Sequence, residues 1–311
     1  MNIFIKNIFA VILIALPFLI SPAVLANSFY VEGEGGVPLA VTTTGNPDGP
    51  EILFLHGLSM GASSFSKQLE SELAEEFRIV AFDLRGHAFS GKPSETSAYD
   101  NPEVWAKDVA RVMEATGLQR PTLVGWSYGS LVAADYLRTF GTAKTSGIVM
   151  VGALGGFTPF FPPDGGIDPM VLANITRMRE LRGSPSFANQ REATELFIPL
   201  LTEGGEDLEW EARAHQLALM VPPYVREPLQ SHPMDNTDIV GLLAELEVMV
   251  IHGSRDPSVS QGGLAALRAV VPHLKVHTLQ GAGHSPFATR PEEFNEALAS
   301  FVRSAYEKGQ K

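Results

Sequence analysis

Short apolar segments alternate with helical stretches along most of this chain, and no other feature of the sequence constrains its fold as strongly. Strands that lack a polar face are typical of a mainly parallel sheet, because helices cover both sides of such a sheet and bury each strand completely. The predicted buried strands span residues 52–56, 78–82, 122–125, 148–151, 248–252 and 275–278. The sequence therefore predicts an α/β fold.

Other segments complete this sheet and its layers. Residues 29–31 and 38–43 predict an antiparallel hairpin at one edge of the sheet. Apolar residues recur at helical spacing in residues 102–116, 128–139 and 291–307, which predicts three flanking helices.

The alternation breaks between residues 153 and 238, where Gly-Gly and Pro-Pro pairs interrupt the chain. This segment predicts a helical cap inserted into an α/β core that consists of residues 27–152 and 239–311. Residues 157–166 predict a loop over the functional site. Six large side chains of the cap are candidates for lining an apolar pocket or for forming the cap's own small core: Phe157, Phe160, Phe161, Trp210, Met220 and Tyr224.

The first 26 residues have the pattern of a cleaved secretory signal peptide. Lys6 lies before an uncharged apolar run at residues 8–20, and Val24 and Ala26 place small side chains before a cleavage point after Ala26. An uncleaved anchor is the alternative, but this run is shorter than the roughly 20 apolar residues that span a bilayer. We therefore expect a periplasmic or secreted protein with no stable membrane insertion after cleavage.

Composition excludes several classes of function. The chain has no cysteine, so it has neither disulfides nor a thiolate metal site. Its formal net charge of −12 argues against nucleic acid as a partner. No His-Glu-x-x-His spacing occurs, and we expect neither a metal nor another cofactor. A small-molecule substrate fits these features, whereas the oligomeric state stays open.

The pentapeptide Gly-Trp-Ser-Tyr-Gly at residues 125–129 lies between a predicted strand and a predicted helix. This is the required context of a Gly-x-Ser-x-Gly nucleophile elbow, whose sharp turn places the serine hydroxyl above the sheet. Chance gives roughly 0.2 matches to the bare pattern in a chain of this composition, so the context carries the inference. Ser127 is therefore the predicted nucleophile.

A serine nucleophile needs a base, and the base needs an acid that fixes its tautomer. His284 follows the last predicted strand and Asp256 follows the strand before it, at the same edge of the sheet as Ser127. The chain order serine, aspartate, histidine is the one that this elbow requires. Asp83 also ends a strand, but it precedes Ser127, and we expect it to brace its loop through Arg85.

An oxyanion that forms during acyl transfer needs two fixed donors. One predicted donor is the backbone N–H of Tyr128, which follows the nucleophile. The other is the backbone N–H of Leu58, in the loop after the strand at residues 52–56, where Gly57 allows close approach of a substrate. Ser59 is a further candidate through its hydroxyl, although a simple loop position explains it equally well.

Across residues 29–305 the chain resembles the α/β-hydrolase superfamily, in particular its capped serine esterases and haloperoxidase-like members. The matching segments are Leu-His-Gly-Leu at 55–58, Asp-Leu-Arg-Gly-His at 83–87, the elbow around Ser127, Gly253 to Asp256, Gly283-His284 and Arg-Pro-Glu-Glu-Phe at 290–294. The resemblance implies an eight-stranded sheet, a cap after the sixth strand and no cofactor.

Within the superfamily, the serine at the elbow disfavours dehalogenases and epoxide hydrolases, which carry aspartate there. Ser285 stands where carbon–carbon bond hydrolases usually have tryptophan. The first interpretation is therefore hydrolysis of a small to medium, partly apolar carboxylic ester through an acyl-enzyme. A carbon–carbon bond hydrolase and a lactonase or perhydrolase with the same triad are alternatives. A non-catalytic binding protein on this fold is an alternative of another class.

Overall fold

The computed structural model describes residues 26–158, 169–202 and 207–310. The predicted signal peptide, apart from Ala26, lies outside these residues. One eight-stranded sheet forms the centre of the fold, with the order β1-β2-β4-β3-β5-β6-β7-β8. Its strands are β1 (Asn27–Glu32), β2 (Pro38–Gly45), β3 (Glu51–Leu55), β4 (Arg78–Phe82), β5 (Thr122–Trp126), β6 (Gly147–Val151), β7 (Glu247–Gly253) and β8 (Lys275–Leu279).

The sheet confirms the predicted architecture. The six strands from β3 to β8 are parallel, and the hairpin of β1 and β2 adds an antiparallel edge that pairs with β4. All six predicted strands occur within two residues of their expected ends, but the last of them is not buried as predicted, because β8 lies at the edge of the sheet and only Leu279 of its residues is buried. The interiors of β3 to β7 are buried, which explains why their sequences are continuously apolar.

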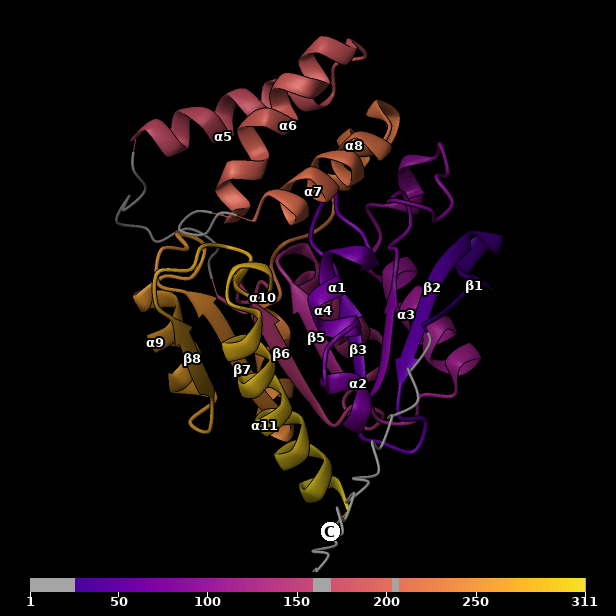
Figure 1. The fold of residues 1–311 in the computed structure, drawn as a ribbon, viewed down its shortest axis with the longest axis vertical. Helices are drawn as coiled ribbons and strands as arrows, with labels where there is room; N and C mark the ends of the chain where they lie inside the picture. The colour runs from indigo at the N-terminus through magenta and orange to yellow at the C-terminus, as the bar shows by residue number, and fades with distance from the viewer. Residues whose placement is uncertain (1–25, 159–168, 203–206, 311) are drawn as a thin grey trace, which may run out of the picture.

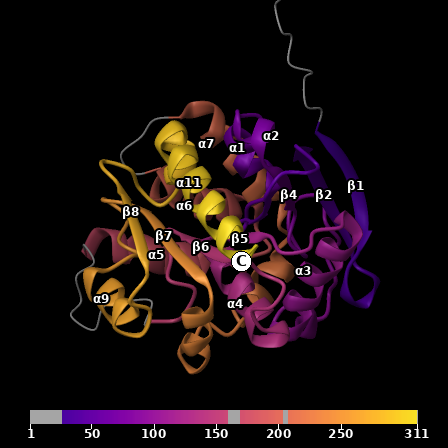
Figure 2. The ribbon, with the colours of Figure 1, turned by 90° about the horizontal axis from the view of Figure 1, so that it is seen from below.

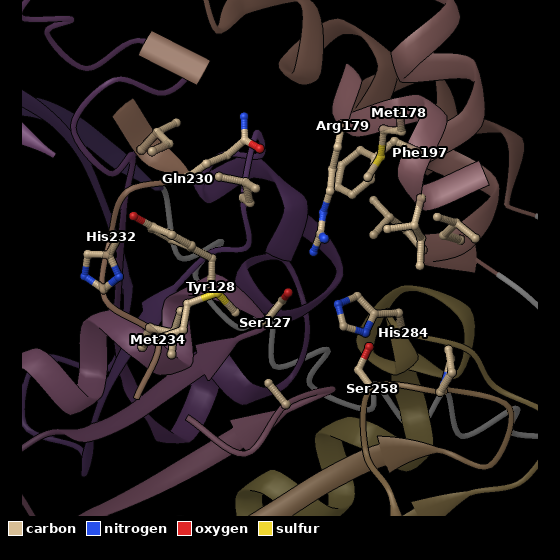
Figure 3. A pocket seen from close by; sticks show the side chains of 18 of the residues that line it. Ser127, Tyr128, Met178, Arg179, Phe197, Gln230, His232, Met234, Ser258 and His284 are labelled. Carbon is tan, nitrogen blue, oxygen red and sulfur yellow. The ribbon is translucent and has the colours of Figure 1, made fainter. Parts of the chain in front are cut away.

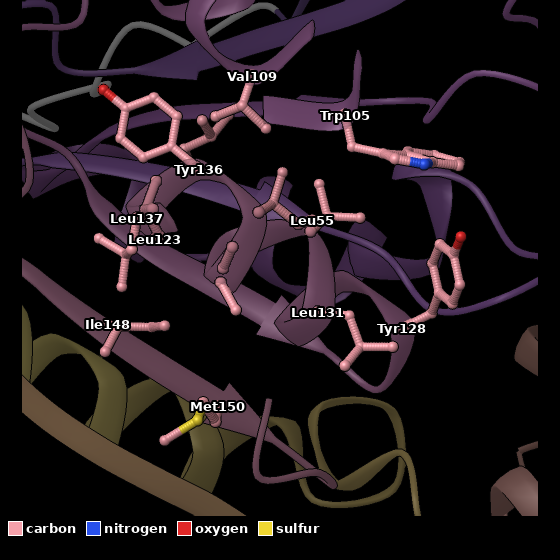
Figure 4. Close-up of a cluster of buried hydrophobic side chains, with 14 of the residues drawn as sticks. Leu55, Trp105, Val109, Leu123, Tyr128, Leu131, Tyr136, Leu137, Ile148 and Met150 are labelled. Carbon is pink, nitrogen blue, oxygen red and sulfur yellow. The ribbon is translucent and has the colours of Figure 1, made fainter. Parts of the chain in front are cut away.

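Helices cover both faces of the sheet and create two cores (Figures 1 and 2). One face packs against α3 (Pro102–Thr116), α4 (Tyr128–Phe140) and α9 (Gln261–Val270). Figure 4 shows part of this core, where Leu131 and Leu137 of α4 lie near Leu123, Ile148 and Met150 of the sheet. The other face packs against α1 (Ser66–Leu69), α2 (Leu73–Glu76), α10 (Pro286–Thr289) and α11 (Pro291–Gly309).

The chain between β6 and β7 forms helices at one end of the sheet (Figure 1). They are α5 (Pro169–Arg182), α6 (Phe187–Thr202), α7 (Leu208–Met220) and α8 (Pro223–Leu229), followed by the 3-10 helix η4 (Thr237–Glu245). We call α5 to α8 the cap helices. Most of the loop predicted at residues 157–166 lies outside the described residues. Among the helices described here, none is both long and apolar enough to cross a membrane.

Candidate active site

A cavity of about 470 Å³ lies between the sheet and the cap helices (Figure 3). The structure brings all five predicted site residues to its wall: Leu58, Ser127, Tyr128, Asp256 and His284. They come from the loops after β3, β5, β7 and β8. Because these strands are parallel, their carboxyl ends meet at one edge of the sheet and bring distant segments of the chain together.

The turn between β5 and α4 holds Ser127 in a strained backbone conformation, with φ 52° and ψ −115°. Only glycine fits on both sides of this turn. A Cβ on Gly125 would lie 2.6 Å from the carbonyl oxygen of Gly129, and a Cβ on Gly129 would lie 2.0 Å from that of Leu55. The two glycines thus permit the sharp turn that presents the Ser127 hydroxyl to the cavity.

His284 and Asp256 form a buried pair beside the serine. Nδ1 of His284 donates to Oδ2 of Asp256 at 3.0 Å, and the N–H of Ser258 donates to Oδ1 at 2.9 Å. Burial opposes ionisation of Asp256, but the interactions with His284 and Ser258 outweigh it, so the pKa of this carboxyl is lowered. With Nδ1 protonated toward the carboxylate, Nε2 is the atom of His284 left to accept a proton.

Ser127 Oγ and His284 face the same cavity, but no hydrogen bond joins them in this structure. Such bonds are often long in proteins without substrate and shorten when substrate binds. The side chain of Trp126 contacts the backbone of the histidine, because its Nε1 donates to the carbonyl oxygen of His284 at 2.9 Å. Trp126, which precedes Ser127, thus helps to fix the backbone of His284.

Two backbone donors are available near Ser127. Tyr128 is the first residue of α4, so its N–H has no acceptor within the helix. The N–H of Leu58 likewise has no backbone acceptor among the described residues. Both residues line the cavity, as expected for an oxyanion hole.

His56 holds the Leu58 loop against the loop after β4. Its Nδ1 donates to the carbonyl oxygen of Gly57 at 2.8 Å, and its Nε2 accepts the N–H of Leu84 at 2.9 Å. His87 stacks edge-on against this ring, with 5.0 Å between the ring centroids. His56 therefore has a structural role.

The buried histidines make stability depend on pH. Burial lowers the pKa of His87 to about 4 and, together with the proximity of His87, lowers that of His56 well below its usual range. Both are therefore neutral in the folded protein at pH 7. In the unfolded chain these histidines take up protons as the pH falls through about 6.5. Their contribution to the free energy of unfolding is therefore fully present above that pH and is lost as the pH falls toward 4.

Urea unfolding at pH 7.5 and 5.5 should therefore show a loss of unfolding free energy, with about 1 kcal/mol due to His87 alone. In His87→Asn, whose amide can still donate to the Arg85 carbonyl that His87 contacts, the loss should be smaller. Equal losses in the two proteins would contradict this role of His87.

The predicted link between Asp83 and Arg85 is wrong. Asp83 does brace its loop, but it accepts the backbone N–H groups of Ala62 and Phe89 at 2.7 and 3.0 Å. Arg85 instead forms a buried ion pair with Asp108 of α3. Asp83 thus joins its loop to the segment after β3, whereas the Arg85 side chain points to α3.

Six large side chains of the cap are candidates in sequence for an apolar pocket or for a core, and none of the four that the structure describes lines the cavity. Phe157 and Trp210 are buried in the two main cores, Met220 lies away from the cavity, and Tyr224 is exposed. Phe160 and Phe161 lie outside the described residues. The apolar side chains from the cap helices that do line the cavity are Ile175, Met178, Phe197, Leu200, Leu201 and Leu229.

The sequence does not indicate the polar side of the cavity. His232 lines it and pairs through Nε2 with Asp135 of α4 at 2.7 Å. The ring of Tyr128 lies against His232, with 5.2 Å between the ring centroids (Figure 3). Arg179 and Arg182 of α5 also line the cavity. No local motif marks any of these residues. The contacts of His232 with Asp135 and Tyr128 join segments that lie far apart in the sequence.

Among the described residues, no group of three His, Asp or Glu side chains could hold a metal ion. The arrangement instead offers a strained serine, a histidine oriented by a carboxylate, and two backbone donors. Such a set of groups can carry out acyl transfer.

Comparison with known proteins agrees with this fold and site. The sequence profile of the alpha/beta hydrolase family matches residues 52–297. The chain is 29% identical over 266 residues to the pimeloyl-[acyl-carrier protein] methyl ester esterase of Xanthomonas oryzae pv. oryzae, which covers 82% of this chain and 96% of that protein. It is 25% identical over 296 residues to a bifunctional esterase/perhydrolase of Acinetobacter calcoaceticus, covering 88% and 99%.

Comparison with solved structures also identifies esterases of the same fold. The crystal structure of an esterase from Rhodococcus sp. ECU1013 superposes with a TM-score of 0.78 and 26% identity, covering 89% of this chain and 99% of that one. The family profile spans most of the chain, and the relatives named above have esterase activity in their names. This chain is therefore an esterase-like hydrolase that belongs to the alpha/beta hydrolase family.

Proposed function

We propose that the protein hydrolyses carboxylic esters through an acyl-enzyme formed on Ser127. The observation that carries this proposal is the cavity itself, in which the strained Ser127 faces a histidine paired with a buried carboxylate. A binding protein would gain nothing from the strain at Ser127, which costs roughly 1–3 kcal/mol.

The reaction follows from these positions. Ser127 Oγ attacks the ester carbonyl carbon while Nε2 of His284 takes the hydroxyl proton. The carbonyl oxygen becomes an oxyanion that accepts the N–H groups of Leu58 and Tyr128. The C–O bond to the alcohol breaks, and the alcohol leaves with the proton from His284. Water then attacks the acyl-enzyme by the same route and restores Ser127.

The cavity wall supports a partly apolar substrate. Met178 and Phe197 of the cap helices and Leu131 of α4 line it together with several aliphatic side chains, whereas polar residues such as Arg179, Arg182 and His232 form the rest of the wall. A volume of about 470 Å³ falls in the range of pockets for small molecules. Ester, lactone and perhydrolase chemistry share the acyl-enzyme step, and the esterase relatives favour the ester.

A substrate panel tests this function. We expect hydrolysis of p-nitrophenyl esters with a preference for short to medium acyl chains, because burial of each added methylene contributes about 0.8 kcal/mol until the cavity is full. The panel includes lactones and vinylogous diketones, and Ser127→Ala is the control. Turnover of diketones without turnover of esters would overturn the assignment, and so would ester hydrolysis that persists in Ser127→Ala.

A further inference from the structure

Two arginines of α5 line the cavity that holds Ser127 and His284. Arg179 points from the helix into the cavity toward these two side chains (Figure 3). Arg182, one turn further along, is only 7% exposed. The wall opposite the nucleophile thus carries two positive charges, although the protein as a whole is acidic.

Neither arginine has a carboxylate partner among the described residues. Arg177, on the same helix, shows the contrast, because it pairs with Glu180 and Glu192 at the surface. Asp256 is the one carboxylate among the described lining residues, and His284 and Ser258 occupy its oxygens. The positive charge that faces the cavity is therefore uncompensated within the described part of the chain.

Among the described residues, none accepts a hydrogen bond from Arg182. Its guanidinium carbon lies 4.7 Å from the ring centroid of Phe197, so the group stacks on an aromatic face. Burial and the nearby charges of Arg226 and Arg179 lower its pKa to about 10, so it stays protonated at neutral pH. Arg226 differs, because it donates to the carbonyl oxygens of Val221 and Ala218.

A buried guanidinium without an acceptor is costly, and an anion that enters the cavity would remove this cost. A carboxylate matches the planar guanidinium with two parallel hydrogen bonds. One such charge-assisted contact is expected to strengthen binding by about tenfold or more.

On this basis we propose that the preferred substrate is an ester that also carries a free carboxylate, which Arg182 and Arg179 bind while Ser127 attacks the ester carbonyl. This inference rests on the proposed esterase function and specifies its substrate class. A phosphate group shares the same chemistry, and the test below distinguishes the two.

The test compares esters that differ only in charge. The first series is the monomethyl esters of dicarboxylic acids from succinate to suberate, each matched with the same ester in which a carboxamide replaces the carboxylate. A second series places the carboxylate on the alcohol portion, as carboxyalkyl butyrates with their carboxamide counterparts. In the wild-type protein, kcat/KM should be at least about tenfold higher for the best carboxylate than for its carboxamide, mainly through KM.

The variants assign this preference to α5. Arg182→Met keeps an apolar side chain of similar reach and should lower the ratio of the two kcat/KM values at least about tenfold, whereas Arg182→Lys should retain part of it. Arg177→Met, which removes an exposed charge from the same helix, should leave the ratio unchanged. A wild-type preference for carboxamides, or an unchanged ratio in Arg182→Met, would overturn the proposal.

A binding measurement separates this proposal from the proposed function. Calorimetric titration of Ser127→Ala with adipate requires no catalysis and should show binding that weakens about tenfold or more in Ser127→Ala/Arg182→Met. If no ester is hydrolysed but adipate binds in this way, the proposed function fails and the anion site stands. Absence of adipate binding, or tighter binding of hexyl phosphate than of adipate, would contradict the carboxylate assignment.

Discussion

Replacement of Ser127 or His284 by alanine is expected to lower kcat for ester hydrolysis by about 10⁴- to 10⁶-fold, whichever of the two is changed. The effects should be similar because the two side chains act as one unit, in which a serine without its base is a poor nucleophile. Asp256→Asn should cost less, because the asparagine keeps a hydrogen bond to Nδ1 of His284 but favours the wrong tautomer.

Folding should survive these changes, because the residues lie at the wall of a cavity and not in either core. Circular dichroism and urea unfolding check this point. His215→Ala serves as the matched control, since His215 lies on α7 and does not line the cavity. Full activity in Asp256→Asn would show that another group orients His284.

The largest expected effect on stability comes from the buried pair of Arg85 and Asp108. Nε and Nη2 of Arg85 each donate to this carboxylate at 2.6 Å, and the side chains are 2% and 1% exposed. The pair also holds the hairpin edge, because Oδ1 of Asp108 accepts the N–H of Glu34 and Nη2 of Arg85 donates to the Glu34 carbonyl. It thus joins the loop after β4, the segment between β1 and β2, and α3.

Arg85→Met should lower the free energy of unfolding by about 3–5 kcal/mol, because it leaves the Asp108 carboxylate buried without its partner. Urea unfolding at pH 7.5 measures the change. Arg191→Ala, which removes an exposed pair with Glu195, should cost no more than about 1 kcal/mol. Similar losses in the two variants would mean that the buried pair adds nothing beyond an ordinary surface contact.

The core of the fold was predictable because its signals are local. The helix expected at residues 102–116 has the same bounds in the structure, since the Asn101 side chain accepts the N–H of Glu103 at one end and Gly117 turns left-handed at the other. The central strands were equally clear, because β3 to β7 are largely apolar runs. In the cap helices, no local signal in the sequence shows which side is buried. Trp210 therefore fits a pocket wall and a core in sequence, and in the structure it packs on Trp126 and Phe287.

Some residues of the site were likewise predictable from local sequence patterns, whereas others were not. Ser127 and Tyr128 lie in a motif of five residues, and Asp256 and His284 follow predictable strands, so sequence alone could bring them together. The pairing of His232 with Asp135 spans 97 positions, and its partners have no shared pattern. That no carboxylate of the described residues pairs with Arg182 likewise depends on how α5 packs, which periodicity does not reveal.

The most direct test of the account is covalent labelling with a fluorophosphonate, which reacts only with a serine that a neighbouring base activates. Mass spectrometry of the digested protein should find one adduct, on the peptide that contains Ser127. The adduct should be absent in Ser127→Ala and greatly reduced in His284→Ala, whereas His215→Ala should label like the wild type. A folded wild-type protein that takes up no label, or carries it on another serine, would contradict the assignment of Ser127 as the nucleophile.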